Sequence, residues 1–194
     1  MTVAGLILAA GESRRMGSPK ALLRYREETF LDTLTALFGR RCPVVIVVLG
    51  SQAAQIRSAA LRPATFVVNP DYARGMTGSL QCGLRALPPE ADAVLFTLVD
   101  HPAVAPATID ALLAPIQRPA PLLRVPRYRS QRGHPIWFSR DLAPEFLALP
   151  PDGAARDVVR RHRNRTEFLD LDDPGIVADI DSPDDYRALL GAGA

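Results

Sequence analysis

Short, continuous apolar segments alternate along the first half of the chain with segments whose apolar residues recur at helical spacing. Apolar runs of this length, bounded by glycine, proline or charged residues, are typical of strands that are buried on both faces of a sheet. We predict four such strands, at Val3–Leu8, Val44–Leu49, Thr65–Val68 and Ala93–Val99. Apolar spacings of three and four residues predict helices at Phe30–Phe38, Gln52–Leu61 and Ser79–Leu87.

This repeated order of strand, helix and strand predicts an α/β fold. A mostly parallel sheet covered by helices on both faces, a Rossmann-like three-layer αβα arrangement, is the architecture that such a pattern favours. No linker-like stretch divides the chain, so we expect residues 1–194 to form a single domain. Ligands of such folds bind beyond the carboxyl ends of the strands, and the loops of the first half should therefore build the site.

The second half of the chain carries weaker signals, because proline and arginine interrupt its apolar segments. We predict strands or extended segments at Leu122–Val125, Ile136–Phe138, Thr166–Leu169 and Ile176–Ile180. Helical spacing predicts helices at Pro106–Ile116, Leu142–Leu149 and Ala154–His162. A final helix is expected after Ser182, which can cap it, with Pro183 at its first position and acidic residues in its first turn.

The composition fits an ordinary globular protein, with 47% hydrophobic and 23% charged residues and a formal net charge of +2. No apolar run approaches the roughly 20 residues that span a bilayer, so we expect a cytoplasmic protein with no membrane partner. The well-mixed charge argues against nucleic acid as a partner. Two cysteines, Cys42 and Cys82, are too few for a four-thiolate zinc site.

The segment after the first predicted strand, residues 8–20, combines two glycines, two arginines and Lys20, the only lysine among the 23 basic residues. Small residues let backbone N–H groups approach phosphate oxygens, and cations neutralise the charge that shifts during phosphoryl transfer. The segment therefore favours a polyphosphate-binding loop over a solvated turn. The spacing of Gly11, Gly17 and Lys20 is not that of a Walker A loop, and no G-x-G-x-x-G dinucleotide fingerprint follows the strand.

The same segment, Leu-Ala-Ala-Gly-x-Ser-x-Arg-Met-Gly-x-Pro-Lys, resembles the opening signature of the MobA-like nucleotidyltransferases. Within this family it is most similar to the cytidylyl- and guanylyltransferases that act on the molybdenum cofactor. The resemblance extends from Ala4 to about Tyr186 and implies a fold of the nucleotide-diphospho-sugar transferase type.

The resemblance also implies roles for the loop residues. Leu8 and the main chain of Ala9–Gly11 would hold the base and ribose side of the nucleotide, Arg15 would bind the triphosphate, and Lys20 would stabilise the phosphoryl group in transfer. In the family, Leu-Ala-Ala-Gly tends to accompany cytosine and Leu-Ala-Gly-Gly guanine. Ala10 therefore favours CTP.

A carboxylate should emerge where the predicted strand Ala93–Val99 ends, because Asp100 follows it directly and Pro102 stops the ladder. Magnesium commonly uses one or two carboxylates together with substrate phosphates, so Asp100 is a candidate ligand of Mg²⁺. The alternative is a loop aspartate that caps the next helix. The resemblance favours the metal, and it assigns no chemistry to His101.

Asp179 and Asp181 lie at i and i+2 of a segment expected to be extended, which would put both carboxylates on one face. They could share one cation, and the resemblance implies that they complete the metal site opposite Asp100. The alternative is that both only add to the negative charge at the start of the final helix.

Two weaker elements concern the substrates. Residues 75–79 precede a predicted helix, so the N–H groups of Gly78 and Ser79 are candidate contacts for the nucleotide, although such glycines also mark plain turns. The resemblance places this segment at the base. His134, in an Arg-Gly-His-Pro element similar to one that lines the acceptor side, could bind a substrate phosphate or buttress the loop.

Five arginines between residues 156 and 165 are predicted to form a solvated helix face, with a dock for a pterin phosphate or a client molybdoenzyme as the alternative. Taken together, these motifs predict a Mg²⁺-dependent nucleotidyltransferase that moves CMP from CTP to the terminal phosphate of molybdenum-loaded molybdopterin and releases pyrophosphate. Use of GTP, or of a sugar phosphate or another small phosphorylated acceptor, is one alternative. A non-catalytic chaperone of the molybdenum cofactor is another.

Overall fold

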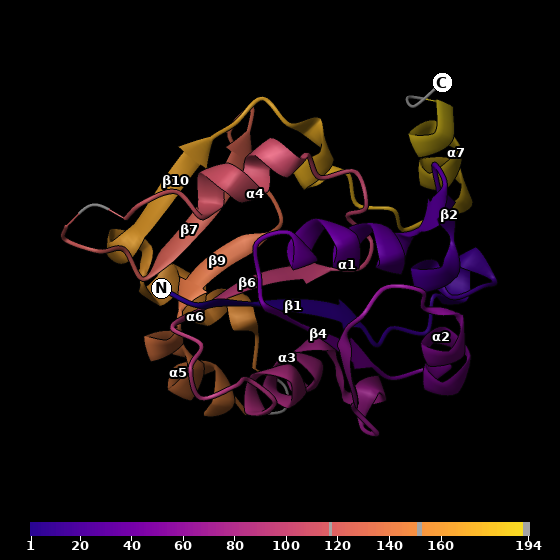
Figure 1. The fold of residues 1–194 in the computed structure, drawn as a ribbon, viewed down its shortest axis with the longest axis horizontal. Helices are drawn as coiled ribbons and strands as arrows, with labels where there is room; N and C mark the ends of the chain where they lie inside the picture. The colour runs from indigo at the N-terminus through magenta and orange to yellow at the C-terminus, as the bar shows by residue number, and fades with distance from the viewer. Residues whose placement is uncertain (117, 151–152, 192–194) are drawn as a thin grey trace.

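A twisted central sheet with helices on both faces forms the body of the protein in a computed structural model that describes residues 1–116, 118–150 and 153–191 (Figure 1). The strand order is β10-β7-β9-β6-β1-β4-β5, and β8 pairs with β7. The strands of this sheet are β1 (Val3–Ala9), β4 (Val44–Leu49), β5 (Thr65–Val68), β6 (Ala93–Leu98), β7 (Leu123–Tyr128), β8 (Gln131–Arg132), β9 (Ile136–Ser139) and β10 (Thr166–Asp170). A separate hairpin consists of β2 (Arg24–Tyr25) and β3 (Glu28–Thr29).

The sheet is mixed but mostly parallel. Strand β1 pairs in parallel with both β4 and β6, and β4 pairs in parallel with β5, so the carboxyl ends of these strands meet at one edge. Strand β9 runs antiparallel between β6 and β7, while β10 pairs in parallel with β7. This arrangement confirms the α/β, three-layer architecture predicted from the alternating pattern.

Two apolar cores, one on each face of the sheet, hold the layers together. On one face, Ile7 of β1 packs in a cluster with Phe30 and Phe38, and on the other Leu6 clusters with Leu80 and Leu84. Alternation of side chains along a strand explains why neighbouring residues of β1 serve opposite cores. The helices are α1 (Phe30–Gly39), α2 (Ala53–Ala59), α3 (Met76–Arg85), α4 (Pro106–Leu112), α5 (Ala143–Leu147), α6 (Ala155–Arg161) and α7 (Pro183–Gly191). None of the helices in the described part of the chain combines the length and the apolar character needed to cross a membrane.

Most predicted elements are present, with boundaries that differ by a few residues. Helix α3 begins at Met76 rather than at Ser79, because Gly75 adopts φ 117°, a turn that few other residues adopt, and the helix starts directly after it. The C-terminal helix is capped as predicted: the Ser182 hydroxyl accepts a hydrogen bond from the backbone N–H of Asp185, and the Asp185 carboxylate accepts one from the N–H of Ser182.

The strand or extended segment predicted at Ile176–Ile180 is not a strand: its first two residues belong to a 3₁₀ turn, and residues 178–180 are irregular. Residues Pro174–Val177 form a 3₁₀ turn, because the Asp173 side chain accepts a hydrogen bond from the N–H of Gly175 and caps this turn. The buried Asp173 carboxylate also accepts bonds from the Ala105 N–H and the Thr108 hydroxyl, which anchors the turn to α4. The cap formed by the Asp173 side chain thus favours a turn where the run of apolar residues predicts an extended segment.

Close packing of α3 against the sheet depends on Gly83. A Cβ atom at this position would contact Leu6 Cδ1 and lie 2.9 Å from Val48 Cγ2, too close for either side chain to remain in place. We therefore expect Gly83→Ala to lower the free energy of unfolding by about 1–3 kcal/mol, the usual cost of overpacking a core. Urea denaturation measures this change.

Gly39→Ala is the matched control, because Gly39 lies at the end of α1 and a Cβ added there meets no atom within 4 Å apart from its chain neighbours and the backbone of its own helix. Its free energy of unfolding should stay unchanged or rise slightly, since alanine favours a helix. Equal stability of the two variants would contradict the packing argument for α3.

Candidate functional site

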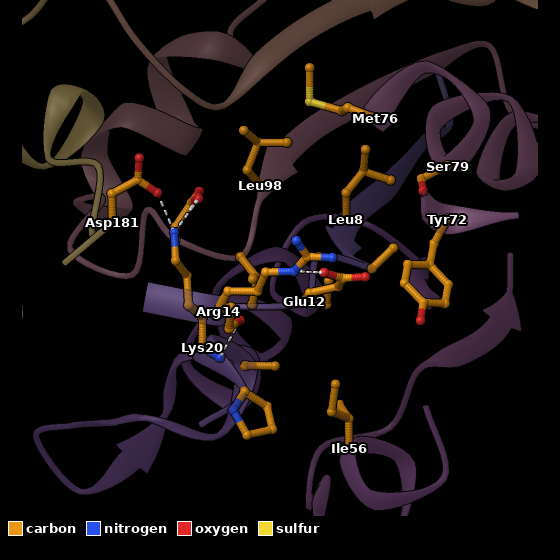
Figure 2. Close-up of a pocket in the computed structure, with 18 of the residues that line it drawn as sticks. Leu8, Glu12, Arg14, Lys20, Ile56, Tyr72, Met76, Ser79, Leu98 and Asp181 are labelled. Atoms are coloured by element: carbon orange, nitrogen blue, oxygen red, sulfur yellow. Dashed lines mark hydrogen bonds and ion pairs between the residues drawn. The ribbon is translucent and has the colours of Figure 1, made fainter. Parts of the chain in front are cut away.

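A cavity of about 610 Å³ opens beyond the carboxyl ends of β1 and β6, where the predicted loop residues and carboxylates converge (Figure 2). Its lining includes nine of the residues expected from the sequence: Leu8, Ala9, Ala10, Gly11, Arg15, Lys20, Ser79, Asp100 and Asp181. Gly78, Asp179 and His134 lie outside the lining. The parallel pairing of β1 with β6 explains the convergence, because it places residues 9–11 and Asp100 at the same edge.

The loop after β1 curls back on itself and returns Lys20 to the strand end. Ser13 and Gly17 adopt left-handed conformations with φ 52° and 66°, on either side of a 3₁₀ turn at Arg14–Met16. The Ser13 hydroxyl then accepts a hydrogen bond of 3.0 Å from the backbone N–H of Lys20. Ser13 therefore closes the loop, a role that its place in the sequence motif does not reveal.

Lys20 is the electrostatic centre of the cavity. Its ammonium nitrogen lies 3.2 Å from Asp100 Oδ2 and 2.5 Å from Asp181 Oδ1, and its side chain is only 13% exposed (Figure 2). Burial by itself would lower the pKa of Lys20, because it disfavours the charged ammonium form. The hydrogen bonds and negative charges of the two carboxylates have the larger combined effect, so the pKa of Lys20 is raised above its usual value. The hydrogen bond from Lys20 lowers the pKa of Asp181. Both groups are therefore charged at neutral pH.

Arg14 and Arg15, adjacent in the sequence, have different surroundings. The guanidinium of Arg14 pairs with Glu12 inside the same loop. Arg15 lies 3.4 Å from Asp181 Oδ2, and its side chain is 73% exposed at the cavity. Arg15 therefore remains available to bind an anion in the cavity.

The three candidate metal ligands do not act alike. Asp181 faces the two cations, whereas Asp179 forms a cluster with Asp100 and His101 in which one potential ligand atom of each residue lies within 4.8 Å of the others. Partial burial and the neighbouring carboxylates of Asp100 and Asp181 raise the pKa of Asp179 to about 6. The expected sharing of one face by Asp179 and Asp181 is thus only partly realised, because the chain there is irregular rather than a regular strand.

His101 belongs to this cluster, although the family resemblance assigns it no chemistry. Burial, followed by the positive charge of Lys20, lowers the pKa of His101 to about 4, so its ring is neutral at physiological pH. The only feature of the sequence that points to a role of His101 in the site is its position beside Asp100. A histidine at this position could equally be a buried residue of the apolar core. The tertiary structure decides that its ring turns toward the carboxylates.

His134 lies behind His101 rather than in the cavity. The two ring centroids are 5.0 Å apart, and the His134 ring packs edge-on against Phe96 at 5.5 Å. Burial, followed by the effect of His101, lowers the pKa of His134 to about 4. Of the two roles that the sequence left open for His134, this placement supports the buttress rather than contact with a substrate phosphate.

The side of the cavity away from the carboxylates is more apolar and is formed by Ile56, Tyr72 and Met76. The sequence carries no signal for Tyr72, and the structure explains its place through its packing over Gly50. A Cβ at Gly50 would lie 2.5 Å from both Ala10 O and Tyr72 Cβ, so only glycine lets the Tyr72 side chain close over the strand ends. The Ser79 hydroxyl is held in place by a hydrogen bond of 3.0 Å from the Asn69 amide.

The five arginines between residues 156 and 165 lie on α6 and the turn that follows. Arg160 pairs with Asp157, Arg161 with Glu145, and Arg165 donates to the carbonyl oxygen of Ala120. These local contacts support the predicted solvated face.

Comparison with known proteins gives a match between residues 5–166 and the family described as MobA-like NTP transferase domain. "Nicotine blue oxidoreductase" of Paenarthrobacter nicotinovorans is 32% identical, over 97% of this chain and 96% of its own. "Molybdenum cofactor cytidylyltransferase" of Escherichia coli (strain K12) is 28% identical, over 93% of this chain and 92% of its own.

Among solved structures, Rv0371c from Mycobacterium tuberculosis H37Rv is similar to this chain. One crystal structure of it superimposes with a TM-score of 0.87 at 36% identity and covers 98% of both chains. A second, in complex with manganese, has a TM-score of 0.82 at 33% identity and covers 99% of this chain and 100% of that one.

The closure of the loop by Ser13 can be tested by hydrogen exchange. Ser13→Ala removes the acceptor for the Lys20 N–H, and we expect the exchange of this amide to accelerate about fivefold, the equivalent of a hydrogen bond worth about 1 kcal/mol. Ser18→Ala is the control, because Ser18 is an exposed serine of the same loop. Unchanged protection of Lys20 in Ser13→Ala would show that the loop closes without this bond.

Proposed function

Because this chain belongs to the family of MobA-like NTP transferase domains, we propose that its 194 residues act as a single domain that transfers CMP from CTP to a small phosphorylated acceptor and releases pyrophosphate. We propose molybdenum-loaded molybdopterin, through its terminal phosphate, as the acceptor. The observation that carries the proposal is the nearly buried ammonium group of Lys20, held between Asp100 and Asp181 in the cavity beside residues 9–11.

Each element of the loop has a separate task in this proposal. The backbone of Ala9–Gly11 binds the base and ribose side of CTP, next to the apolar wall that contains Tyr72. The exposed Arg15 binds the triphosphate, since its long contact with Asp181 is readily exchanged for a phosphate oxygen. Lys20 exchanges one carboxylate for the phosphoryl group in transfer, with little loss of conformational freedom because it is already oriented.

The reaction needs no covalent intermediate with the protein. An oxygen of the acceptor phosphate attacks the α-phosphorus of CTP, a new P–O bond forms, and the bond to the bridging oxygen of the leaving pyrophosphate breaks. The protein contributes alignment and fixed positive charge, which stabilise the transition state without reorganisation. Asp100 and Lys20 position the reacting groups because both side chains are mostly buried.

The carboxylates fit a divalent cation. Asp100 Oδ1 is buried and has no hydrogen-bond partner among the described residues, so an oxygen ligand is available there. We propose that Asp100, Asp179 and Asp181 hold Mg²⁺, the ion that oxygen ligands and phosphates commonly bind. Bound there, the cation would neutralise phosphate charge during transfer. The manganese complex of Rv0371c supports a divalent ion in this family.

The choice of CTP and of a pterin acceptor rests on Ala10 and on the similarity to the cytidylyltransferase of Escherichia coli. The oxidoreductase name of the Paenarthrobacter relative points to a different reaction class. A cytoplasmic location and a client molybdoenzyme as partner are part of the same proposal. A chaperone without catalysis would bind the molybdenum cofactor but release no pyrophosphate when CTP and Mg²⁺ are added.

Lys20→Ala is expected to lower the rate of pyrophosphate release by about 10²–10³, by analogy with the loss of one transition-state donor. The melting temperature of the variant should confirm that it folds. Arg41→Ala is the control, because it removes another cation that is paired with an aspartate, Asp110, on the surface. Near-normal turnover of Lys20→Ala would overturn the role of Lys20.

Base selection by Ala10 can be measured in the same assay with CTP and GTP in parallel. We expect the wild-type protein to prefer CTP in kcat/KM, and Ala10→Gly to shift the ratio toward GTP, because glycine at this position accompanies guanine in the family. A clear preference of the wild-type protein for GTP would contradict the assignment of the base.

A further inference from the structure

We infer that His101 is a nitrogen ligand of the divalent cation and makes the site prefer a transition-metal ion such as Mn²⁺ to Mg²⁺. This inference deepens the proposed function and rests on it for the role of the cation in the reaction. It concerns a residue outside the set of carboxylates Asp100, Asp179 and Asp181.

The two oxygens of Asp100 face different groups. Oδ2 accepts the hydrogen bond from Lys20, whereas Oδ1 lies 3.8 Å from His101 Nε2. This distance is too long for a hydrogen bond. Two ligands that are each about 2.1 Å from one metal ion can lie up to about 4.2 Å apart, so the pair has a spacing that a shared cation would bridge.

Burial singles out these groups from ordinary surface acids. The side chain of His101 is only 7% exposed. Asp100 Oδ1, the oxygen that faces its Nε2 atom, is buried and has no hydrogen-bond partner in the described part of the chain. Buried polar atoms normally have a partner, so this carboxylate oxygen at the edge of an anionic cluster indicates a missing ligand.

The fold also holds the third member of the cluster in place. The backbone N–H of Ile180 donates a hydrogen bond of 3.1 Å to the carbonyl oxygen of Asp100, which ties the segment with Asp179 to the end of β6. The ring of the buried His134 packs against that of His101, with the two centroids 5.0 Å apart. The three potential ligands thus come from two segments that are locked to each other.

An imidazole changes which ion such a site favours. Mg²⁺ takes oxygen ligands almost exclusively and dehydrates reluctantly, whereas first-row transition ions accept imidazole nitrogen readily. Carboxylate oxygens alone suit either ion. With His101 as an additional, nitrogen ligand, the site gains affinity for Mn²⁺ without a matching gain for Mg²⁺.

Pulsed electron paramagnetic resonance of the full chain loaded with Mn²⁺ tests the nitrogen ligand directly, without nucleotide or turnover. We expect modulation from a directly bound ¹⁴N nucleus in the wild-type protein and its loss in His101→Gln. Displacement of bound Mn²⁺ by Mg²⁺ should show a preference for Mn²⁺ of at least about 10-fold, reduced to about threefold or less in His101→Gln.

His162→Gln is the matched control, because His162 is a histidine remote from the cluster and paired with Glu145. It should keep both the ¹⁴N modulation and the preference for Mn²⁺. Failure of the wild-type protein to bind Mn²⁺, bound Mn²⁺ without ¹⁴N modulation, or an unchanged preference in His101→Gln would each overturn the inference. Where His101→Gln does not fold, the absence of ¹⁴N modulation in the wild-type spectrum still overturns the inference.

The assay of pyrophosphate release separates this inference from the proposed function. Nitrogen ligation in a protein that releases no pyrophosphate would leave the ligand assignment standing and overturn the transferase. Pyrophosphate release with Mn²⁺ but without ¹⁴N modulation would overturn only the role of His101.

Discussion

The ion pairs between the ammonium group of Lys20 and the carboxylates of Asp100 and Asp181 are the interaction on which the site depends. These partners are separated by 80 and 161 positions in the chain, and Asp179 adds a third carboxylate to the group. Carboxylates gathered so closely repel one another unless a cation lies among them. The only lysine of the chain supplies that charge, at the point where a nucleotide and a metal ion meet in the proposed reaction.

The sheet is what makes this gathering possible. Parallel pairing of β1 with β6 brings the loop that carries Lys20 and the strand end that carries Asp100 to one edge. The C-terminal segment reaches the same edge through the hydrogen bond between Ile180 and Asp100, and the cap of α7 by Ser182 follows directly. A cluster of charges therefore lies at the edge of a sheet whose two faces are covered by apolar cores.

The division of labour among neighbouring residues has a common cause. Asp181 pairs with cations while Asp179 lies near Asp100 and His101, and Arg14 pairs within its loop while Arg15 faces the cavity. Adjacent residues of one sequence motif thus meet different environments, because irregular backbone turns them toward different neighbours. A motif marks the region of the site but does not assign each contact inside it.

The amino-acid sequence by itself determined the alternation of buried strands and helices, the family signature at residues 8–20, and the position of Asp100 at a strand end. These features follow from local hydrophobic spacing and short motifs, which can be recognised without knowing which residues lie close together in the folded protein. Only the tertiary structure decided that Ser13 closes the loop, that Tyr72 lies over Gly50 and that His101 turns toward the carboxylates. Contacts of this kind depend on backbone turns and on packing between distant segments. Neither produces a periodic pattern of hydrophobic and polar residues that could be recognised in the sequence.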